Sequence, residues 1–537
     1  MVTGVVKPVE MAARALMVLG TASHVGKSLI TAALGRILSD RGFRVAPFKA
    51  QNMALNSAAT IDGGEIGRAQ ALQAEACRVA ATVDMNPVLI KPSSDTGAQV
   101  IVCGRVWGQV TARDYHQRRV EELFPLVLAC YQRLAIAHDV VVIEGAGSPA
   151  EINLKAHDIV NMRMASAADA ACVLVGDIDR GGVFASLLGT MALLDHRERE
   201  RVRGFVINKF RGDLDLLTPG VAMIERRLRR PCVGVIPYLP AIGLDEEDSV
   251  SLEDRRTPAR AWRNTDATDA DRPLRIGVIA LPHMANFTDF DALAAEPTVQ
   301  LAYLERSGDL HDADVAIVPG TKQTSDDLAW LRRSGFAAAL EARAVERRPI
   351  VGICGGLQML GQQVRDPLAV EGGGVATGLG LLPIVTELQA TKTTVNASAS
   401  WSNLQLFGHS IGAIEARGYE IHMGETAYVG NARPFGQIRR AGARDVVDDG
   451  AADHDGRIIG TYLHGLFDAD DFRHAFLRAA RAVCGLAPPS KVACVAAERD
   501  ARLNRLAQHV AQSIDVDAVL AWIGLPAHRL CSTKSRA

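Results

Sequence analysis

Short runs of consecutive apolar residues recur through the first half of the chain and alternate with longer stretches of helical periodicity. Uninterrupted Val/Ile/Leu-rich runs bounded by Gly, Asp or Asn are typical of strands that are buried on both faces of a parallel sheet. The alternation of such strands with helices therefore predicts an α/β fold. The runs are ALMVL (15–19), RVAPF (44–48), DVVVI (139–143), ACVLV (171–175), GFVIN (204–208) and CVGVI (232–236).

The segment that follows Gly26 has the pattern of an amphipathic helix, and Gly42 supplies a C-terminal stop for it. Its apolar positions recur with helical spacing, so that they fall on one stripe of the predicted helix. These positions are Leu29, Ile30, Ala33, Leu34, Ile37 and Leu38.

A second pattern of strands and helices begins after a polar stretch without periodicity. We expect an N-terminal domain over 1–245, a linker over 246–273, a second α/β domain over 274–487 and a C-terminal extension over 488–537. Within the second domain, the stretch 389–417 is interpreted as a variable loop. The apolar runs of this domain are RIGVIAL (275–281), DVAIVPG (314–320), PIVGICGG (349–356) and IIGTYLHG (458–465).

Composition narrows the classes of protein that this chain can be. The 537 residues are 48% hydrophobic and 22% charged, which predicts a folded chain rather than a disordered one. The 59 basic and 61 acidic side chains nearly cancel, so no nucleic-acid or anionic-membrane partner is expected. The nine cysteines form no CxxC pair, and no apolar run is long enough for a bilayer span or a signal-peptide core. These features predict a cytoplasmic enzyme that acts on small molecules.

The sequence GTASHVGKS (20–28) lies between a predicted strand and a predicted helix, which is the setting of a phosphate-binding loop. Gly20, Thr21 and Gly26 would wrap the phosphates of ATP with backbone N–H groups. Lys27 would reach the terminal phosphates, and the Ser28 hydroxyl would bind Mg²⁺. The spacing from Gly20 to Gly26 is one residue longer than in the common motif, and a glycine turn with a surface lysine is the alternative.

Four further polar residues are candidates for the same nucleotide site, because strand ends of an open α/β sheet meet at one edge. Glu144, after a buried strand, and Asp62 are predicted metal ligands. Lys49 is predicted to meet a phosphate, and Asn208 to contact the purine base. Taken alone, each could equally be a solvated charge or amide at a strand end.

The turn GICGG places Cys354 between a predicted strand and a predicted helix. Small residues on both sides allow the sharp turn of a nucleophile elbow, and the start of the helix favours the thiolate. The N–H of Gly355 and the backbone at Gly320 are predicted to stabilise an oxyanion. His464 is the predicted base, and His422 remains a competitor. An inert buried cysteine is the alternative interpretation.

A thiol nucleophile and an ATP site in one chain favour a reaction in which the product of one site is used at the other. ATP can convert a carboxylate to an acyl phosphate, which ammonia then attacks. Because free ammonia is mostly protonated at neutral pH, its release from glutamine through a cysteine thioester inside the protein is an economical solution. The sequence therefore predicts glutamine-dependent amidation.

The motifs VGICGGLQMLG (351–361), GYEIHMG (418–424) and GTYLHGLFD (460–468) resemble the class I glutamine amidotransferases of the cobyrinate and cobyrate amidase subgroup. The loop at 20–28 resembles the dethiobiotin-synthetase-like branch of P-loop proteins. Several longer motifs resemble those of the cobyric acid synthase family. They are FKAQNMALNS (48–57), GGEIGRAQALQAEA (63–76), MNPVLIKPSSD (85–95), DIDRGGVFAS (177–186), NKFRGD (208–213) and NFTDFDAL (286–293).

The resemblance implies a P-loop-like domain followed by a flavodoxin-like amidotransferase domain. It implies ATP- and glutamine-dependent amidation of the b, d, e and g carboxylates of adenosylcobyrinic acid a,c-diamide, with Mg²⁺ as cofactor. It also implies that Cys354 is the nucleophile and His464 the catalytic histidine. Leu466 stands where most class I amidotransferases have a glutamate, which leaves the group that orients His464 open. The polyanionic corrin substrate suggests basic contacts such as Lys91 and Arg180.

Three other functions compete with this interpretation. The sister enzyme that amidates the a and c carboxylates shares both domain types. A lipid II amidase has a different synthetase half, which the N-terminal motifs contradict. A P-loop switch ATPase would not need an intact elbow at Cys354. A homo-oligomer is compatible with all of them.

Overall fold

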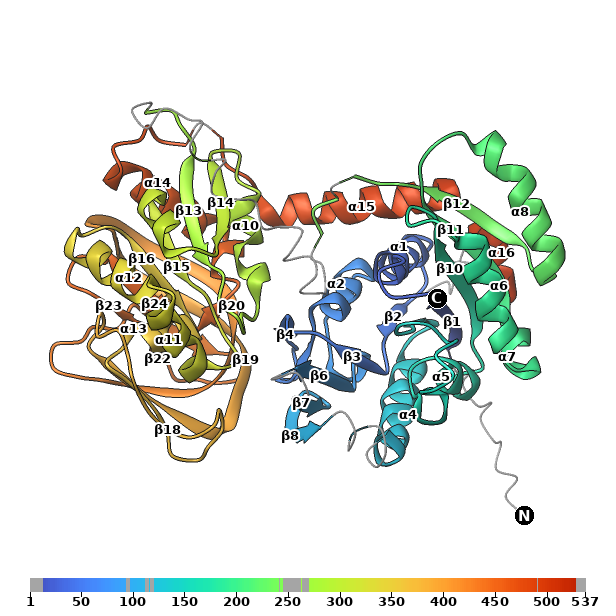
Figure 1. Cartoon of the computed structure of the whole chain (residues 1–537), viewed down its shortest axis with the longest axis horizontal. Coiled ribbons are helices and arrows are strands. Elements are labelled where there is room, and N and C mark those ends of the chain that lie inside the picture. Colours follow the sequence, from blue (N-terminus) through green and yellow to red (C-terminus); the bar gives the residue numbers. More distant parts are fainter. Residues whose placement is uncertain are drawn as a thin grey trace, which may run out of the picture.

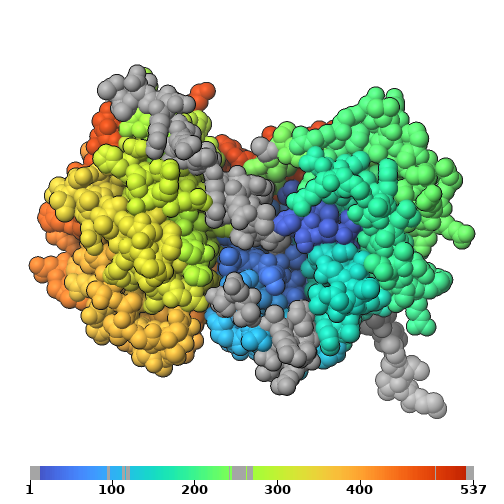
Figure 2. All heavy atoms as spheres, in the orientation of Figure 1, coloured from blue at the N-terminus to red at the C-terminus, as the bar shows by residue number. Residues whose placement is uncertain are grey.

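We describe the protein from a computed structural model that covers residues 13–92, 97–111, 115, 120–240, 242–244, 262, 270–489 and 491–527. The chain forms two α/β halves that lie side by side, as Figure 1 shows. In the space-filling view, the yellow and orange surface of the second half and the teal and green surface of the first lie on opposite sides (Figure 2). The α/β prediction is confirmed.

The first half is built on a parallel sheet of six strands with the order β12-β11-β10-β1-β9-β2. Each of the six apolar runs predicted as strands contributes one of them. The strands are β1 (Arg14–Gly20), β2 (Val45–Phe48), β9 (Val140–Glu144), β10 (Ala171–Asp177), β11 (Val202–Phe210) and β12 (Cys232–Pro237).

Helices flank this sheet, and the predicted helix after Gly26 is confirmed as α1 (Lys27–Asp40). Its apolar stripe packs on the sheet, and Gly42 follows its end with φ 89°. The other helices of this half are α2 (Arg68–Ala76), α4 (Val120–Ala137), α5 (Met162–Ala167), α6 (Val183–Leu193), α7 (His196–Arg201) and α8 (Leu214–Leu228).

A small β-layer, which the apolar runs did not predict, extends the first half toward the second. It consists of a four-stranded sheet, β3-β6-β7-β8, and a separate hairpin, β4-β5. Its strands are only three to seven residues long, and β6 and β7 bury apolar side chains such as Val88, Leu89 and Ile101. They are β3 (Gln51–Met53), β4 (Ser57–Ala59), β5 (Glu65–Gly67), β6 (Val88–Pro92), β7 (Gly97–Val102) and β8 (Arg105–Thr111).

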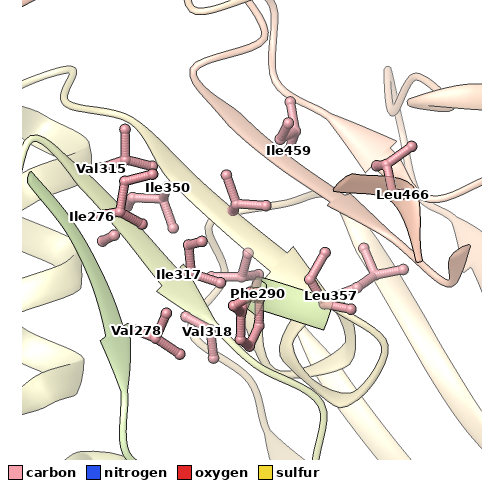
Figure 3. Close-up of a cluster of buried hydrophobic side chains, with 14 of the residues drawn as sticks. Ile276, Val278, Phe290, Val315, Ile317, Val318, Ile350, Leu357, Ile459 and Leu466 are labelled. Carbon is pink, nitrogen blue, oxygen red and sulfur yellow. The ribbon is translucent and has the colours of Figure 1, made fainter. Parts of the chain in front are cut away.

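The second half has its own six-stranded sheet, β14-β13-β15-β16-β24-β23, in which only the β23–β24 pairing is antiparallel. Its inward-facing side chains form a buried cluster in which Ile317 and Val318 lie near Phe290 and Ile276 lies near Val315 and Ile350 (Figure 3). The strands are β13 (Leu274–Ile279), β14 (Val299–Leu304), β15 (Val315–Val318), β16 (Ile350–Ile353), β23 (Ala451–Ala452) and β24 (Ile458–Thr461). The helices include α11 (Thr324–Arg333), α12 (Phe336–Val345), α13 (Gly355–Leu360) and α14 (Asp470–Val483).

The interpretation of 389–417 as a variable loop is wrong. The segment lies in two long antiparallel strands, β19 (Ile384–Leu406) and β20 (His409–Tyr428). Buried and exposed positions alternate over residues 397–401 of β19, which is the period of a strand with one covered face. The same sheet contains β17 (Gln363–Asp366), β18 (Gly374–Thr377), β21 (Gly436–Arg440), β22 (Val447–Asp449) and β25 (Leu463–His464).

The C-terminal segment returns to the first half of the molecule. Helix α15 (Val495–Ser513), red in Figure 1, packs against α1 and β12, and α16 (Val516–Trp522) follows it. The buried Arg36 of α1 donates to the Asp500 carboxylate at 2.7 Å and to the Asn504 side chain at 3.0 Å. The C-terminal helices therefore join the second half to the helix that follows the phosphate loop.

Most of the predicted linker, 246–261 and 263–269, lies outside the described residues. Within the predicted linker, Trp262 is buried, and its carbonyl accepts a hydrogen bond from Arg275 at 2.6 Å. In the described part of the chain, no helix is long and apolar enough to cross a membrane.

Candidate functional site

The predicted phosphate loop connects the end of β1 to the start of α1. Gly26 has φ 99°, a conformation that residues with a Cβ rarely adopt. The Lys27 ammonium donates to the carbonyls of Ala22, at 2.9 Å, and Gly147, at 3.0 Å, so it lies across the loop. A Cβ on Gly20 would lie 2.8 Å from the Lys27 Nζ atom, which explains the glycine there. The loop is thus shaped around the amine that would meet the phosphates.

Glu144, at the end of β9, is the centre of a buried polar cluster beside this loop. Its carboxylate accepts from the Ser28 hydroxyl at 2.8 Å, from Lys49 at 3.0 Å and from the Gln73 amide at 2.5 Å. Burial acts to raise the pKa of Glu144, but Lys49 and the Gln73 and Ser28 hydrogen bonds outweigh it and lower the pKa. The carboxylate is therefore ionised at neutral pH.

A hard cation fits this cluster. A serine hydroxyl and an ionised carboxylate are oxygen ligands of the kind that Mg²⁺ prefers, usually together with waters and substrate phosphates. The Gln73 side chain, whose amide donates to Glu144, has a buried Oε1 atom that finds no hydrogen-bond partner among the described residues, so an acceptor group remains available beside the carboxylate. Gln73 is a residue of this cluster that the sequence interpretation missed.

Asp62 and Asn208 lie in different places from Glu144. Asp62 is exposed in the turn between β4 and β5, where it accepts from the Val83 N–H at 3.3 Å. Among the described residues, no contact joins Asp62 to Ser28 or Glu144. Asn208, at the end of β11, donates to the Val25 carbonyl at 2.8 Å and so holds the phosphate loop itself.

Cys354 lies in the sharp turn between β16 and α13. Its φ of 51° is unusual for a residue with a side chain, as expected of a nucleophile elbow. The flanking glycines are sterically required, because a Cβ on Gly356 would lie 1.9 Å from the Val318 carbonyl oxygen and one on Gly352 would lie 2.8 Å from the Leu357 nitrogen. The strained turn therefore presents the thiol above the strand ends.

His464 lies next to Cys354 and is oriented by Asp289. The His464 Nδ1 atom is 2.6 Å from one Asp289 carboxylate oxygen, and the Gly465 N–H donates to the other at 3.0 Å. The second ring nitrogen, Nε2, has no hydrogen bond with the described residues and adjoins the Cys354 thiol. Burial acts to lower the pKa of His464, but Asp289 and Cys354 outweigh it and raise the pKa to about 10.

Asp289 is held in place by its neighbours. It belongs to a 3-10 turn, η5 (Phe287–Phe290), whose two phenylalanines are buried in the core of the second half. Figure 3 shows Phe290 beside Ile317 and Val318. In the sequence this segment is part of the motif NFTDFDAL, and no signal there places it against a histidine 175 residues later. Asp289 occupies the role that a glutamate at position 466 would fill.

The other predicted residues surround the same thiol. A Cβ on Gly320 would lie 3.6 Å from the His464 ring and 3.7 Å from the Cys354 Cβ atom. Gly355 follows Cys354 as the first residue of α13. His422 lines the same pocket, but its Nδ1 atom is 2.9 Å from the Gly424 carbonyl and its Nε2 atom is 3.1 Å from Glu420. Both of its ring nitrogens are therefore engaged.

The pocket at Cys354 lies between the two halves of the molecule. Residues of β6, β7 and β8 line it together with those of the second half. Nearby, two asparagines bind across the boundary: Asn286 accepts from the Ser57 N–H at 3.1 Å, and Asn56 accepts from the Phe287 N–H at 3.1 Å. The turn that carries Asp289 is thereby tied to the first half.

The two basic residues suggested for a corrin substrate differ in their surroundings. Arg180 is exposed just beyond the end of β10, at the nucleotide edge. Lys91 is buried in β6, pairs with Glu65 and lines the Cys354 pocket, so it does not lie at that edge.

Comparison with known proteins identifies both halves. Residues 16–251 match the CobQ/CobB/MinD/ParA nucleotide binding domain, and residues 275–472 match the CobB/CobQ-like glutamine amidotransferase domain. Cobyric acid synthase of Sorangium cellulosum is 50% identical over 96% of this chain and 99% of its own length. The chain belongs to the cobyric acid synthase family. The proteins of that name from Desulforudis audaxviator and Klebsiella pneumoniae are 49% and 47% identical, each over 96% of this chain and over 100% and 99% of their own lengths.

Membership makes the chain a glutamine-dependent ligase of cobalamin biosynthesis with a nucleotide-binding domain, as the sequence motifs predict. The Cys354 elbow and the phosphate loop lie in the two matched regions, one in each half.

Proposed function

We propose that the chain converts adenosylcobyrinic acid a,c-diamide to adenosylcobyric acid by amidating the b, d, e and g carboxylates with glutamine and ATP. The observation that carries this proposal is the Cys354–His464–Asp289 arrangement in the same chain as the Glu144 phosphate-loop cluster. The relatives from Sorangium cellulosum and Desulforudis audaxviator are cobyric acid synthases, and their name supports cobyric acid as the product.

Ammonia forms at the Cys354 site. The thiolate attacks the side-chain amide carbon of glutamine while the N–H of Gly355 and the backbone at Gly320 stabilise the oxyanion. The His464 imidazolium gives its proton to the departing ammonia, and a thioester remains on Cys354. Neutral His464 then takes a proton from a water molecule that hydrolyses the thioester to glutamate. Asp289 fixes the tautomer and orientation of His464 throughout.

The phosphate loop serves the second step. The γ-phosphoryl group of ATP passes to a carboxylate of the corrin substrate, which gives an acyl phosphate and ADP. Ammonia attacks the acyl carbon, and inorganic phosphate leaves. We expect Lys27, which lies across the phosphate loop, and Lys49, which pairs with Glu144, to contact the phosphates. Ser28 and Glu144 would hold Mg²⁺, which would supply charge neutralisation on the transferring group.

Product analysis tests the substrate. The purified protein is incubated with adenosylcobyrinic acid a,c-diamide, glutamine and Mg-ATP, and mass spectrometry counts the added amides. Four additions are expected. No addition to this diamide, but two to cobyrinic acid itself, would assign the chain to the sister activity instead.

We also propose a cytoplasmic location, because ATP and glutamine, the co-substrates of the proposed reaction, are supplied there.

A further inference from the structure

The pocket beside Cys354 contains more lysines than its carboxylates neutralise. Lys322, which follows β15, and Lys392 of β19 come from the second half, and Lys91 of β6 comes from the first. All three line the pocket that also contains the thiol. Three ammonium groups so close together repel one another unless anions separate them.

One buried carboxylate, Glu65 of β5, is shared by two of these lysines. Lys91 pairs with one of its oxygens and Lys392 with the other. The hydroxyl of Ser57 also donates to Glu65 at 2.7 Å, so the carboxylate is fully engaged. Among the described residues, no acidic group lies within ion-pair distance of Lys322, so the three lysines have only one paired carboxylate between them.

The lowered pKa values of the three lysines agree with a cluster whose positive charge is not fully neutralised. Burial, reinforced by Lys91, lowers the pKa of Lys322 to about 8. Burial likewise lowers the pKa of Lys392 and of Lys91 to about 8, although Glu65 opposes it in both cases. An anion entering the pocket would favour the charged form of all three lysines.

The same pocket also contains a carboxylate, that of Glu371, whose pKa is raised. Glu371 accepts from the Thr324 N–H at 2.6 Å through one oxygen, and burial raises its pKa to about 7. Lys322 acts on Glu371 electrostatically and also on Cys354, so the three groups are neighbours. A cation arriving beside Glu371 would favour its ionised form.

We propose that this pocket recognises the zwitterionic head of glutamine: Lys322, supported by Lys392 and Lys91, binds the α-carboxylate, and Glu371 binds the α-ammonium group. The side-chain amide then reaches Cys354. This inference rests on the proposed glutaminase activity of Cys354 and adds the residues that select glutamine over other amides. Because Lys91 and Glu65 belong to the first half, the glutamine subsite is complete only when both halves are in place.

Paired variants and truncated substrates test the assignment. Lys322→Met is compared with wild type on glutamine and on 4-aminobutanamide, which lacks the α-carboxylate, with ammonia release as the readout. We expect kcat/KM for glutamine to fall roughly 10- to 100-fold, mainly through KM, as expected for a lost charge-assisted hydrogen bond. On 4-aminobutanamide the variant and the wild type should be equal. Glu371→Gln should likewise lower kcat/KM for glutamine. On glutaric acid monoamide, which lacks the α-amino group, this variant and the wild type should be equal.

Two controls accompany these variants. Lys491→Met changes an exposed lysine away from the pocket and should leave both substrates unaffected. Amidation of the corrin substrate with an ammonium salt reports whether each variant folds and keeps its synthetase activity. If Lys322→Met lost activity equally on glutamine and on 4-aminobutanamide, the head-group assignment would be wrong. A wild-type protein that released no ammonia from glutamine would instead overturn the glutaminase assignment on which it rests.

Discussion

Replacing Asp289 by asparagine tests the part of the active site that no local motif revealed. The substitution keeps the shape of the side chain but removes the charge 2.6 Å from the His464 Nδ1 atom. Both side chains are buried, at 1% and 5% exposure, so water cannot replace the lost partner. The asparagine amide can also donate to Nδ1, which favours the wrong imidazole tautomer for a base at Nε2.

The expected loss is large. Asp289 raises the pKa of His464 against the opposing effect of burial, so its removal destabilises the imidazolium that donates a proton to the leaving ammonia. The analogous aspartate-to-asparagine change in a serine protease triad lowers kcat about 10⁴-fold. We therefore expect glutamine-dependent amidation to fall about 10²- to 10⁴-fold, which corresponds to roughly 3 to 5 kcal/mol of transition-state stabilisation.

The assay compares two nitrogen sources. Asp289→Asn should lose glutamine-dependent amidation but retain amidation from an ammonium salt, since the phosphate loop is untouched. Alkylation of Cys354 by iodoacetamide, measured as a function of pH, reports the state of the thiol–imidazole pair in the same variant. Glutamine-dependent activity within threefold of wild type would refute the role assigned to Asp289.

Three further outcomes follow from the same geometry. Glu144→Gln should lower ADP release at least about 100-fold with glutamine and with ammonia alike, because a neutral amide cannot replace the carboxylate of the predicted metal site; equal rates would contradict the assignment. Gly356→Ala should lower the free energy of unfolding, at the upper end of about 1 to 3 kcal/mol, and with it the thermal midpoint, since the added Cβ would lie 1.9 Å from a carbonyl oxygen. Gly189→Ala, whose added Cβ would have no neighbour within 4 Å, should not lower the midpoint. Similar midpoints for the two variants would count against the steric argument. The pKa of His464 is raised from 6.5 to about 10 in the folded protein, so its contribution to the free energy of unfolding should be complete below about pH 6.5 and lost as the pH rises through about 10. The free energies of unfolding of wild type and Asp289→Asn, measured with denaturant, should therefore differ most at low pH. A difference independent of pH would contradict this.

Local patterns predicted the elements that lie in the two cores. Buried parallel strands carry continuous apolar runs, so all six strands of the first sheet could be found from the sequence. The elbow at Cys354 was equally local, because its glycines adjoin it in the chain. The strands β3 to β8 were missed although β6 and β7 bury apolar side chains such as Val88, Leu89 and Ile101, because strands of three to seven residues are too short for periodicity to identify them.

Contacts between distant segments were missed for a different reason. The amphipathic pattern of α15 shows that it buries one face, but not that the face packs on α1 of the other half. Lys91 gave the same difficulty: its charge suggested a contact with the polyanionic corrin substrate, whereas the fold pairs it with Glu65 at the wall of the Cys354 pocket. In both cases the sequence indicates a type of interaction, and the topology selects the partner.

The central claim is that one chain makes ammonia at Cys354 and uses it at a separate ATP site. Its most direct test is the amide count on adenosylcobyrinic acid a,c-diamide for Cys354→Ala, with glutamine and with an ammonium salt as alternative nitrogen sources. The account predicts no amides from glutamine and four from ammonia. Four amides from glutamine, or none from ammonia in a folded variant that still hydrolyses ATP, would contradict it.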